Sequence, residues 1–195
     1  MNRIINLKLI ILLFLAIIVS SCIQSSHAPE EEDIPKILNN EKSMVIISTK
    51  PIVGSGVFLS DKEIVKMWWT HDKTKNELRF ENFDTFIDTK ISKDLEFYIV
   101  NPGLYHLTYL QFHPEEGHTI SGSGKMASFY AKPGEVVYLG QIEINFRDYD
   151  CNNPNFWTKA AKVNDNFNKD KEKIIDFEPR LQHRIVKRLV KKLEN

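Results

Sequence analysis

The sequence predicts a mainly β protein, an antiparallel β-sandwich followed by an amphipathic α-helical tail. Short runs of β-branched and aromatic residues alternate with turn residues between Ser43 and Phe146, a pattern typical of antiparallel strands. Two Pro-Gly pairs fall between such runs, and the pattern changes after Phe146. With this spacing a barrel is the alternative to a sandwich. The expected strands are residues 44–49, 56–59, 63–69, 77–80, 96–100, 105–112, 127–131 and 136–146.

The two Pro-Gly pairs predict tight turns between strands. Asn101-Pro102-Gly103 precedes one run, and Lys132-Pro133-Gly134 precedes another. Proline presets φ at the first central position of a type II turn, and glycine accepts the positive φ of the second. Tyr105 and Tyr138, which follow the turns, are expected to pack. Glu135, directly after the second glycine, has no evident role in the sequence.

The C-terminal extension, residues 147–195, is predicted to be helical, with helices over 164–175 and 180–193 separated by Phe177-Glu178-Pro179. At 100° per residue the second helix is amphipathic. In one interpretation its apolar face packs on the β-domain and its basic face is solvated; in the other the basic face contacts an anionic surface or an acidic partner. The apolar side holds Leu181, Ile185, Val186, Leu189, Val190 and Leu193, and the basic side holds Arg180, Arg184, Lys187, Arg188 and Lys191.

The first residues have the pattern of an export signal. Arg3 and Lys8 precede an apolar run that ends at Val19-Ser20-Ser21-Cys22. The run is shorter than the ~20 residues that a membrane-spanning helix needs, and the tetrapeptide resembles the bacterial lipobox. We expect residues 1–21 to be a cleaved lipoprotein signal peptide and Cys22 to be lipidated, rather than a plain secretory signal or an uncleaved anchor. The acyl chains, palmitate among the common ones, would hold the protein to the membrane.

The residue after the lipidated cysteine favours one membrane. Ile23 is not the aspartate that favours retention in the inner membrane, so we expect attachment to the outer membrane, facing the periplasm. Residues 22–42 are polar and acidic and are interrupted by Pro35, which predicts a flexible tether. About 20 residues at ~3.3–3.6 Å each would reach some 70 Å.

Composition limits the remaining classes of function. The chain has 26 basic and 26 acidic residues, and loss of Arg3 and Lys8 with the signal peptide leaves the mature chain slightly acidic. No overall positive field favours nucleic acid. The length predicts one domain, residues 43–146, with its terminal segments. If Cys22 is lipidated, Cys151 has no intramolecular partner, and the fold depends on no disulfide.

Two strand motifs point to a family. The segments NPGLYHL (101–107) and FYAKPGEVVYLGQIEINF (129–146), together with the lipobox, resemble a family of uncharacterised bacterial lipoproteins that carry a domain of unknown function. The resemblance covers most of the mature chain. It implies a prealbumin-like or immunoglobulin-like β-sandwich in the cell envelope, and it brings no activity and no catalytic residues.

Known catalytic and metal motifs do not fit the sequence. GHTISGSGK (117–125) lacks the Walker A spacing and the following helix, which predicts a flexible hairpin loop. His106 and His113, seven apart on one strand, face opposite sides unless a bulge intervenes. His113, Glu115 and His118 would form at most a weak loop site. No nucleophile motif is present. We therefore expect no enzyme, no metal and no cofactor.

Adjacent tryptophans are the other candidate for binding. On a strand, Trp68 and Trp69 face opposite ways, so one is expected to pack inward while the other stacks on a sugar or a partner side chain. Together with Arg184, Lys187, Arg188 and Lys191 they form the candidate partner surface.

Three functions remain from the sequence. The first is a non-enzymatic, lipid-anchored envelope protein that acts as an interaction or structural module with a protein partner. The second is a binding protein for a small envelope ligand, a glycan, lipid or metal ion, that uses Trp68-Trp69 or residues 113–118. The third, an envelope hydrolase, lacks a recognisable nucleophile and base.

Overall fold

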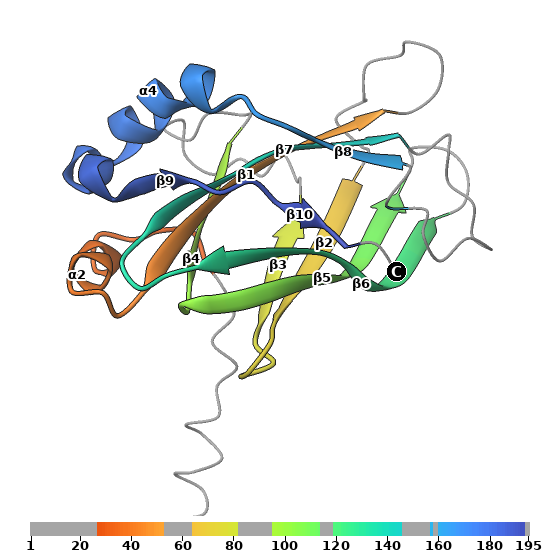
Figure 1. The fold of residues 1–195 in the computed structure, drawn as a ribbon, viewed down its shortest axis with the longest axis horizontal. Helices are drawn as coiled ribbons and strands as arrows, with labels where there is room; N and C mark the ends of the chain where they lie inside the picture. Colours follow the sequence, from red (N-terminus) through yellow and green to blue (C-terminus); the bar gives the residue numbers. More distant parts are fainter. Residues whose placement is uncertain are drawn as a thin grey trace, which may run out of the picture.

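A computed structural model describes residues 27–52, 64–81, 95–113, 119–145, 157 and 160–193, and it confirms the mainly β class (Figure 1). Two packed sheets form a β-sandwich, with one short α-helix near the C-terminus, as the sequence predicts. The elements are α2 (Asp33–Leu38), β1 (Ser43–Ile52), β2 (Ile64–His71), β3 (Glu77–Glu81), β4 (Glu96–Val100), β5 (Gly103–His113), β6 (Ile120–Ala131), β7 (Val136–Asn145), β8 (Ala161–Asn164), α4 (Phe167–Phe177), the 3₁₀ helix η2 (Pro179–Arg184), β9 (Ile185–Lys187) and β10 (Lys191–Lys192).

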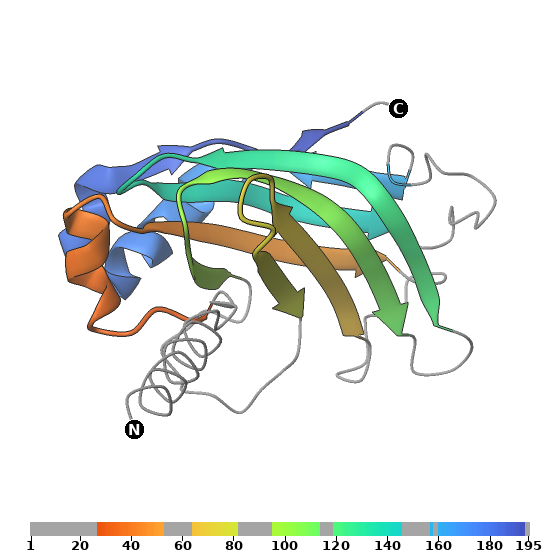
Figure 2. The same cartoon turned by 90° about the horizontal axis from the view of Figure 1, so that it is seen from below.

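The two sheets differ in their strand pairing. Sheet A has the order β4-β1-β7-β8, with β9 also beside β7, and sheet B has the order β10-β6-β5-β2-β3. Figure 2 shows β6, β5, β2 and β3 of sheet B side by side. Sheet B is antiparallel throughout, whereas β1 pairs in parallel with β7, as does β9. The antiparallel prediction therefore needs one correction: sheet A is mixed, because the chain between β1 and β7 crosses over and contributes four strands of sheet B.

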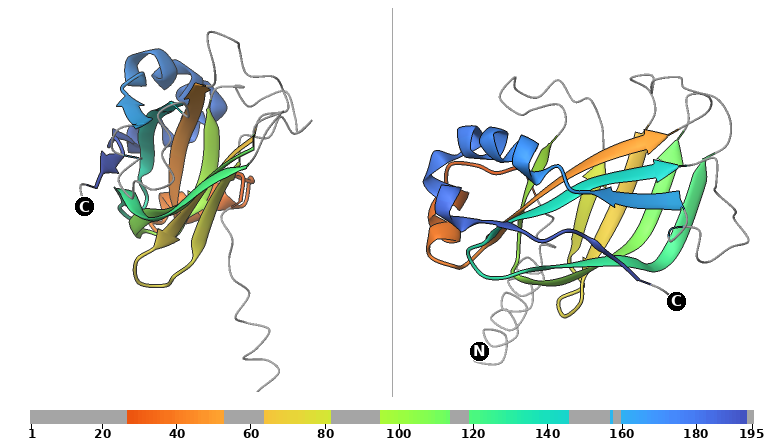
Figure 3. Two further views of the ribbon diagram at one scale, coloured as in Figure 1. Left: turned by 90° about the vertical axis from the view of Figure 1, so that its right-hand side faces the viewer. Right: turned by 45° about the horizontal axis from the view of Figure 1, so that its top comes forward.

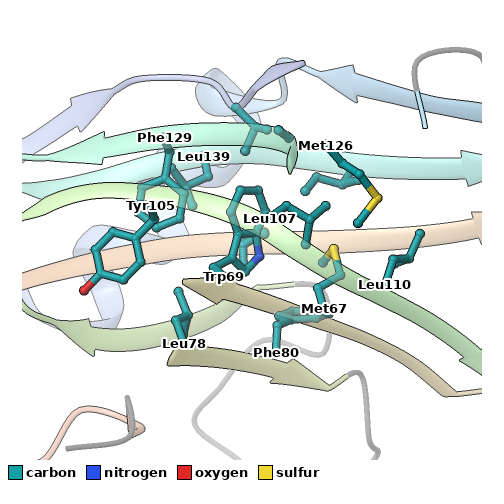
Figure 4. Packing of buried hydrophobic residues seen from close by; sticks show 14 of the residues in the cluster. Met67, Trp69, Leu78, Phe80, Tyr105, Leu107, Leu110, Met126, Phe129 and Leu139 are labelled. Atoms are coloured by element: carbon teal, nitrogen blue, oxygen red, sulfur yellow. The ribbon is translucent and has the colours of Figure 1, made fainter. Parts of the chain in front are cut away.

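The molecule has three layers, sheet B, sheet A and the helices, with one apolar cluster between each pair of neighbouring layers. One apolar cluster fills the space between the sheets, with Trp69, Phe80, Phe112 and Leu107 almost wholly buried (Figure 4). A second cluster lies on the other face of sheet A, among residues of α2, α4 and η2. Figure 3 shows the course of these helices beside sheet A. Sheet A is covered on both faces where β1 and β7 begin, which explains why residues 44–47 and 136–139 are apolar without alternation, whereas β7 alternates after Gly140.

The two predicted turns differ in geometry. Gly134 has φ +75, and the Glu135 N–H donates to the Lys132 carbonyl at 3.1 Å, which fits the type II prediction. Gly103 has φ +153, far from the ~+80 of that turn type. A Cβ there would lie 2.0 Å from Nε2 of His71. The glycine is therefore required by the close approach of His71, and the type II prediction is wrong at this position.

The predicted helix over 180–193 is wrong. Pro179–Arg184 is a 3₁₀ helix, and the chain then runs extended through β9 and β10. The Arg188 and Val190 N–H groups donate to the carbonyls of Tyr138 and Leu139, both at 3.0 Å. These bonds to a sheet edge replace the intrahelical ones. By contrast, the helix predicted over 164–175 is present as α4.

Residues 27–42 are packed on the domain, so the predicted tether does not extend to residue 42. Ile34 and Ile37 of α2 are 3% and 0% exposed and belong to the second apolar cluster. His27 forms an isolated antiparallel bridge with Ile99 of β4. The acidic composition of this segment concealed the apolar side of α2, which buries two residues one turn apart.

Candidate functional site

The outer face of sheet B is the candidate interaction surface. The described helices pack on sheet A, whereas outward side chains of sheet B are mostly exposed or partly exposed. Along β5 and β6, the cross-strand pair Leu104 and Tyr130 is 36% and 44% exposed. We call this surface the sheet B face; its side chains include Lys66, Trp68, Thr70, Arg79, Leu104, His106, Thr108, Tyr109, Gln111, Ser123, Lys125 and Tyr130.

The two tryptophans face opposite ways, as predicted. Trp69 is 0% exposed in the core, and its indole N–H has no hydrogen-bond partner. Trp68 lies on the sheet B face, where Arg79 of β3 is 4.9 Å and Tyr109 of β5 is 4.5 Å from its ring centroid. Because β3 and β5 flank β2 on opposite sides, both faces of the Trp68 ring are covered. Trp68 is thus the middle of a cross-strand ladder and offers no free face for a sugar.

A bulge interrupts the middle of the sheet B face. Trp68 and Trp69 of β2 pair with Tyr109 and Leu107 of β5, so Thr108 of β5 has no partner residue on β2. The Thr108 hydroxyl lies 2.8 Å from that of Thr70 and donates to the Trp68 carbonyl at 3.2 Å. The bulge shifts the inward-facing positions by one residue, from Tyr105 and Leu107 before it to Leu110 and Phe112 after it. It also places His106 and His113 on the same face, the exception that the sequence prediction allowed for.

The histidines of this face do not form a described metal site. His113 Nδ1 bonds the Thr119 hydroxyl at 2.9 Å, while His106 Nε2 lies 3.8 Å from Asp72. Burial, reinforced by Lys125, lowers the pKa of His106, and its buried Nδ1 has no partner. Within the described ranges no group of three or more His, Cys, Asp or Glu side chains could hold a metal ion. Residues 114–118, with the rest of the predicted loop site, lie outside them.

The segment GHTISGSGK is not a loop over most of its length. Ile120 to Lys125 belong to β6, and Ile120 to Ser123 pair with Phe112 to Tyr109 of β5. Gly124, with φ +131, lies where the register between β5 and β6 shifts. The predicted hairpin loop is therefore wrong from residue 120 onward.

Three of the four basic residues predicted to contact a partner are used inside the molecule. We call residues 185–193 the C-terminal strap. Arg184, just before it, donates to Asn40 at 2.7 Å and to the Leu38 carbonyl at 3.0 Å. Lys187 pairs with Asp165 at 2.7 Å. Arg188 donates to the Tyr130 carbonyl at 2.7 Å. Lys191 is exposed.

Glu135 is the acceptor that holds the strap, a role that its sequence context did not reveal. Its Oε2 lies 2.6 Å from Arg188 Nη1 and accepts from the Lys132 N–H at 3.0 Å, and its Oε1 accepts from Arg188 Nη2 at 3.1 Å. The Arg188 guanidinium therefore holds the pKa of Glu135 below its usual value. Val190 is 5% exposed, so the strap covers the edges of β6 and β7 with both charge and apolar contact.

Two further buried carboxyl groups are structural. Asp170 of α4 accepts from the buried Tyr138 hydroxyl at 2.7 Å and fastens α4 to sheet A. At the other edge, burial raises the pKa of Glu96 to about 7, against the opposing hydrogen bond of 2.5 Å from the Tyr98 hydroxyl. No local sequence motif marks the Tyr138–Asp170 pair, because its members lie on a strand and a helix whose contact depends on the fold, whereas Glu96 and Tyr98 lie two residues apart on β4.

Comparisons with known proteins add no assignment. No family model matches the chain, and no curated protein matches it. A leucine-rich repeat protein from Bacteroides thetaiotaomicron is similar to it at a TM-score of 0.31 and 11% identity, over 54% of this chain and 14% of that chain. This likeness is too low to carry an argument. The resemblance to the lipoprotein family therefore stays a prediction.

Cys22, Cys151 and the signal segment lie outside the described residues. In the part of the chain that the structure does describe, none of the helices has the length and apolar character needed to cross a bilayer.

Proposed function

We propose that this chain is a lipid-anchored lipoprotein of the bacterial cell envelope, with a non-enzymatic sandwich domain that binds another envelope protein. Cys22 supplies the anchor, and the sheet B face supplies the binding surface. The observation that carries the proposal is the asymmetry of the sandwich: the described helices cover sheet A, while the outward side chains of sheet B are exposed or partly exposed.

The chemistry of the sheet B face suits a protein partner. Tyr, Trp and Arg are enriched at protein interfaces, and this face carries Trp68, Tyr109, Tyr130 and Arg79 on neighbouring strands. The ladder of Arg79, Trp68 and Tyr109 is held in place by its own stacking. Such rigid aromatic groups lose little conformational entropy when a partner binds.

The other surfaces have less support. The basic residues near the C-terminus hold the strap to Asn40, Asp165 and Glu135, so an anionic partner would compete with internal ion pairs. For a small ligand, Trp68 lacks a free ring face, and no other observation favours that function. The protein-binding module is therefore the function we adopt.

The anchor is tested by Cys22→Ala. We expect the precursor to escape lipoprotein processing and the protein to leave the outer-membrane fraction, because alanine has no thiol to take the glyceride. Immunoblotting of membrane and soluble fractions, with the mass of the mature N-terminus, measures both. Wild-type processing and attachment in the variant would show that the lipoprotein assignment is wrong.

The binding face is tested by photo-crosslinking in cells. A benzophenone amino acid at Ser123, exposed on the sheet B face, is expected to give a discrete protein adduct. The matched control is Lys171, exposed on α4 at the opposite layer. A second test adds Tyr130→Ala to the Ser123 probe, which we expect to reduce the adduct at least threefold. No adduct from Ser123, or the same adduct from both positions, contradicts the proposed binding face.

A further inference from the structure

We infer that the domain rests directly on the phospholipid surface through one corner, which consists of His27, the start of α2 and the outer edge of β4. This inference depends on the proposed lipid anchor at Cys22. It deepens the proposed function because it fixes which side of the domain faces the bilayer.

The chain is fixed to the domain at His27. The Ile99 N–H of β4 donates to the His27 carbonyl at 3.0 Å, so His27 adds one bridge to the edge of sheet A. Its side chain is held too, since Nε2 lies 2.7 Å from Oδ2 of Asp33. Both the backbone and the ring of His27 are therefore tied to the fold.

Asp33 makes this attachment strong. Its side chain is 1% exposed and also accepts from Lys36 at 3.0 Å and from the Glu30 N–H at 3.2 Å. Burial opposes ionisation, but the bonds from His27, Lys36 and Glu30 leave the pKa of Asp33 below its usual value. A buried, fully bonded carboxylate is costly to leave without its partners, which keeps residues 27–36 together.

The attachment shortens the spacer to the lipid. Five residue steps separate Cys22 from His27, and at ~3.3–3.6 Å per residue they span at most about 18 Å. A tether that ran to residue 42 would reach about 70 Å and leave the orientation of the domain free. With the short spacer, His27 stays within about 18 Å of the headgroups, so the β4 edge and the start of α2 are the parts of the domain held nearest the bilayer.

The charges at this corner suit a zwitterionic headgroup layer. Glu30, Glu31 and Glu32 are exposed carboxylates, and Arg180 Nη1 lies 2.6 Å from Glu31 Oε1. Lys36 adds a second cation, 3.4 Å from Glu32. The exposed carboxylate of Glu30 can meet the ammonium groups of phosphatidylethanolamine, while Arg180 and Lys36 already neutralise the carboxylates beside them. The sheet B face is a separate surface and stays accessible to a protein.

Photo-crosslinking to lipid tests the orientation. The mature lipoprotein is reconstituted into vesicles of phosphatidylethanolamine with a minor fraction of phosphatidylglycerol, with a benzophenone amino acid at Glu32 or, as the control, at Ser123. Glu32 is suitable because its side chain is 74% exposed. We expect at least fivefold more phospholipid adduct from Glu32 than from Ser123. Equal yields, or a higher yield from Ser123, overturn the inference.

A spacer variant tests whether the short segment between Cys22 and His27 holds this corner at the lipid. Insertion of 20 Gly/Ser residues between Gln24 and Ser25 keeps the anchor and lengthens the reach. We expect the adduct from Glu32 to fall to the Ser123 level, and an unchanged yield overturns the inference. The mass of the N-terminus is determined on the same samples. An unmodified Cys22 contradicts the proposed anchor itself, whereas a lipidated Cys22 without preferential Glu32 adducts contradicts only the orientation.

Discussion

Trp69→Ala is expected to lower the free energy of unfolding by about 3–5 kcal/mol, the range seen when a large buried aromatic side chain is truncated. Trp69 is 0% exposed, and its ring packs 5.1 Å from that of Phe129, on the strand two positions away in sheet B. Alanine would leave a cavity between the sheets. Urea unfolding followed by far-ultraviolet circular dichroism measures the change without relying on tryptophan fluorescence.

Its neighbour provides the matched control. Trp68→Ala removes the same side chain from the sheet B face, where it is only partly buried, and should cost about 1 kcal/mol for the lost ladder contacts. Trp69→Phe should cost less than about 2 kcal/mol, because it keeps most of the ring and removes an N–H that has no partner. Equal losses for the two alanine variants would show that the inward and outward assignments are wrong.

Gly103→Ala is expected to cost about 2–5 kcal/mol, since it combines a rare backbone conformation with a steric clash. The residue has φ +153, and a new Cβ would lie 2.0 Å from Nε2 of His71. That ring cannot easily move, because Nδ1 accepts from the Thr74 N–H at 3.0 Å and Nε2 lies 3.2 Å from the Pro102 carbonyl oxygen. The same urea experiment measures the loss.

Gly124→Ala separates the two causes. Gly124 also has a positive φ, +131, but nothing lies within 4 Å of a Cβ built there. Its substitution should cost only the backbone strain, about 1–3 kcal/mol. If Gly103→Ala is no more destabilising than Gly124→Ala, the contact with His71 is not what requires the glycine. In that case the double variant Gly103→Ala with His71→Ala should also show no coupling.

The two terminal segments act on the domain in different ways. The strap covers the β6 and β7 edges and is held by Arg188 and Glu135. The N-terminal segment pairs with the β4 edge and is held by His27 and Asp33. Both protect strand edges that would otherwise be open to unwanted pairing. Under the proposed function, a partner would bind the sheet B face rather than the two edges that these segments protect.

Local patterns in the sequence predict most of the described strands; the run 56–59 lies outside the described residues, and the run 127–131 is only the end of β6. The runs around Met44, Ile64, Phe97 and Val136 each became a strand at nearly the expected bounds, because alternation and β-branched residues act within a few positions. The opposite directions of Trp68 and Trp69 follow from the same period of two. The lipobox at Cys22 is likewise local, and with Ile23 it carries the predicted location.

Only the tertiary structure decided the features that depend on distant segments. The amphipathic sequence 180–193 fits a helix by itself, but the open edges of β6 and β7 offer backbone partners to Arg188, Val190 and Leu193, and an extended strap satisfies them. The acidic composition before Ser43 predicts a tether, but in the fold Asp33 bonds His27 and Lys36 and holds this segment in place. Local preferences in the sequence determine most of the strands of the two sheets and the turn at Gly134. The conformations of residues 27–42 and of the C-terminal strap depend on contacts that exist only once both sheets have formed.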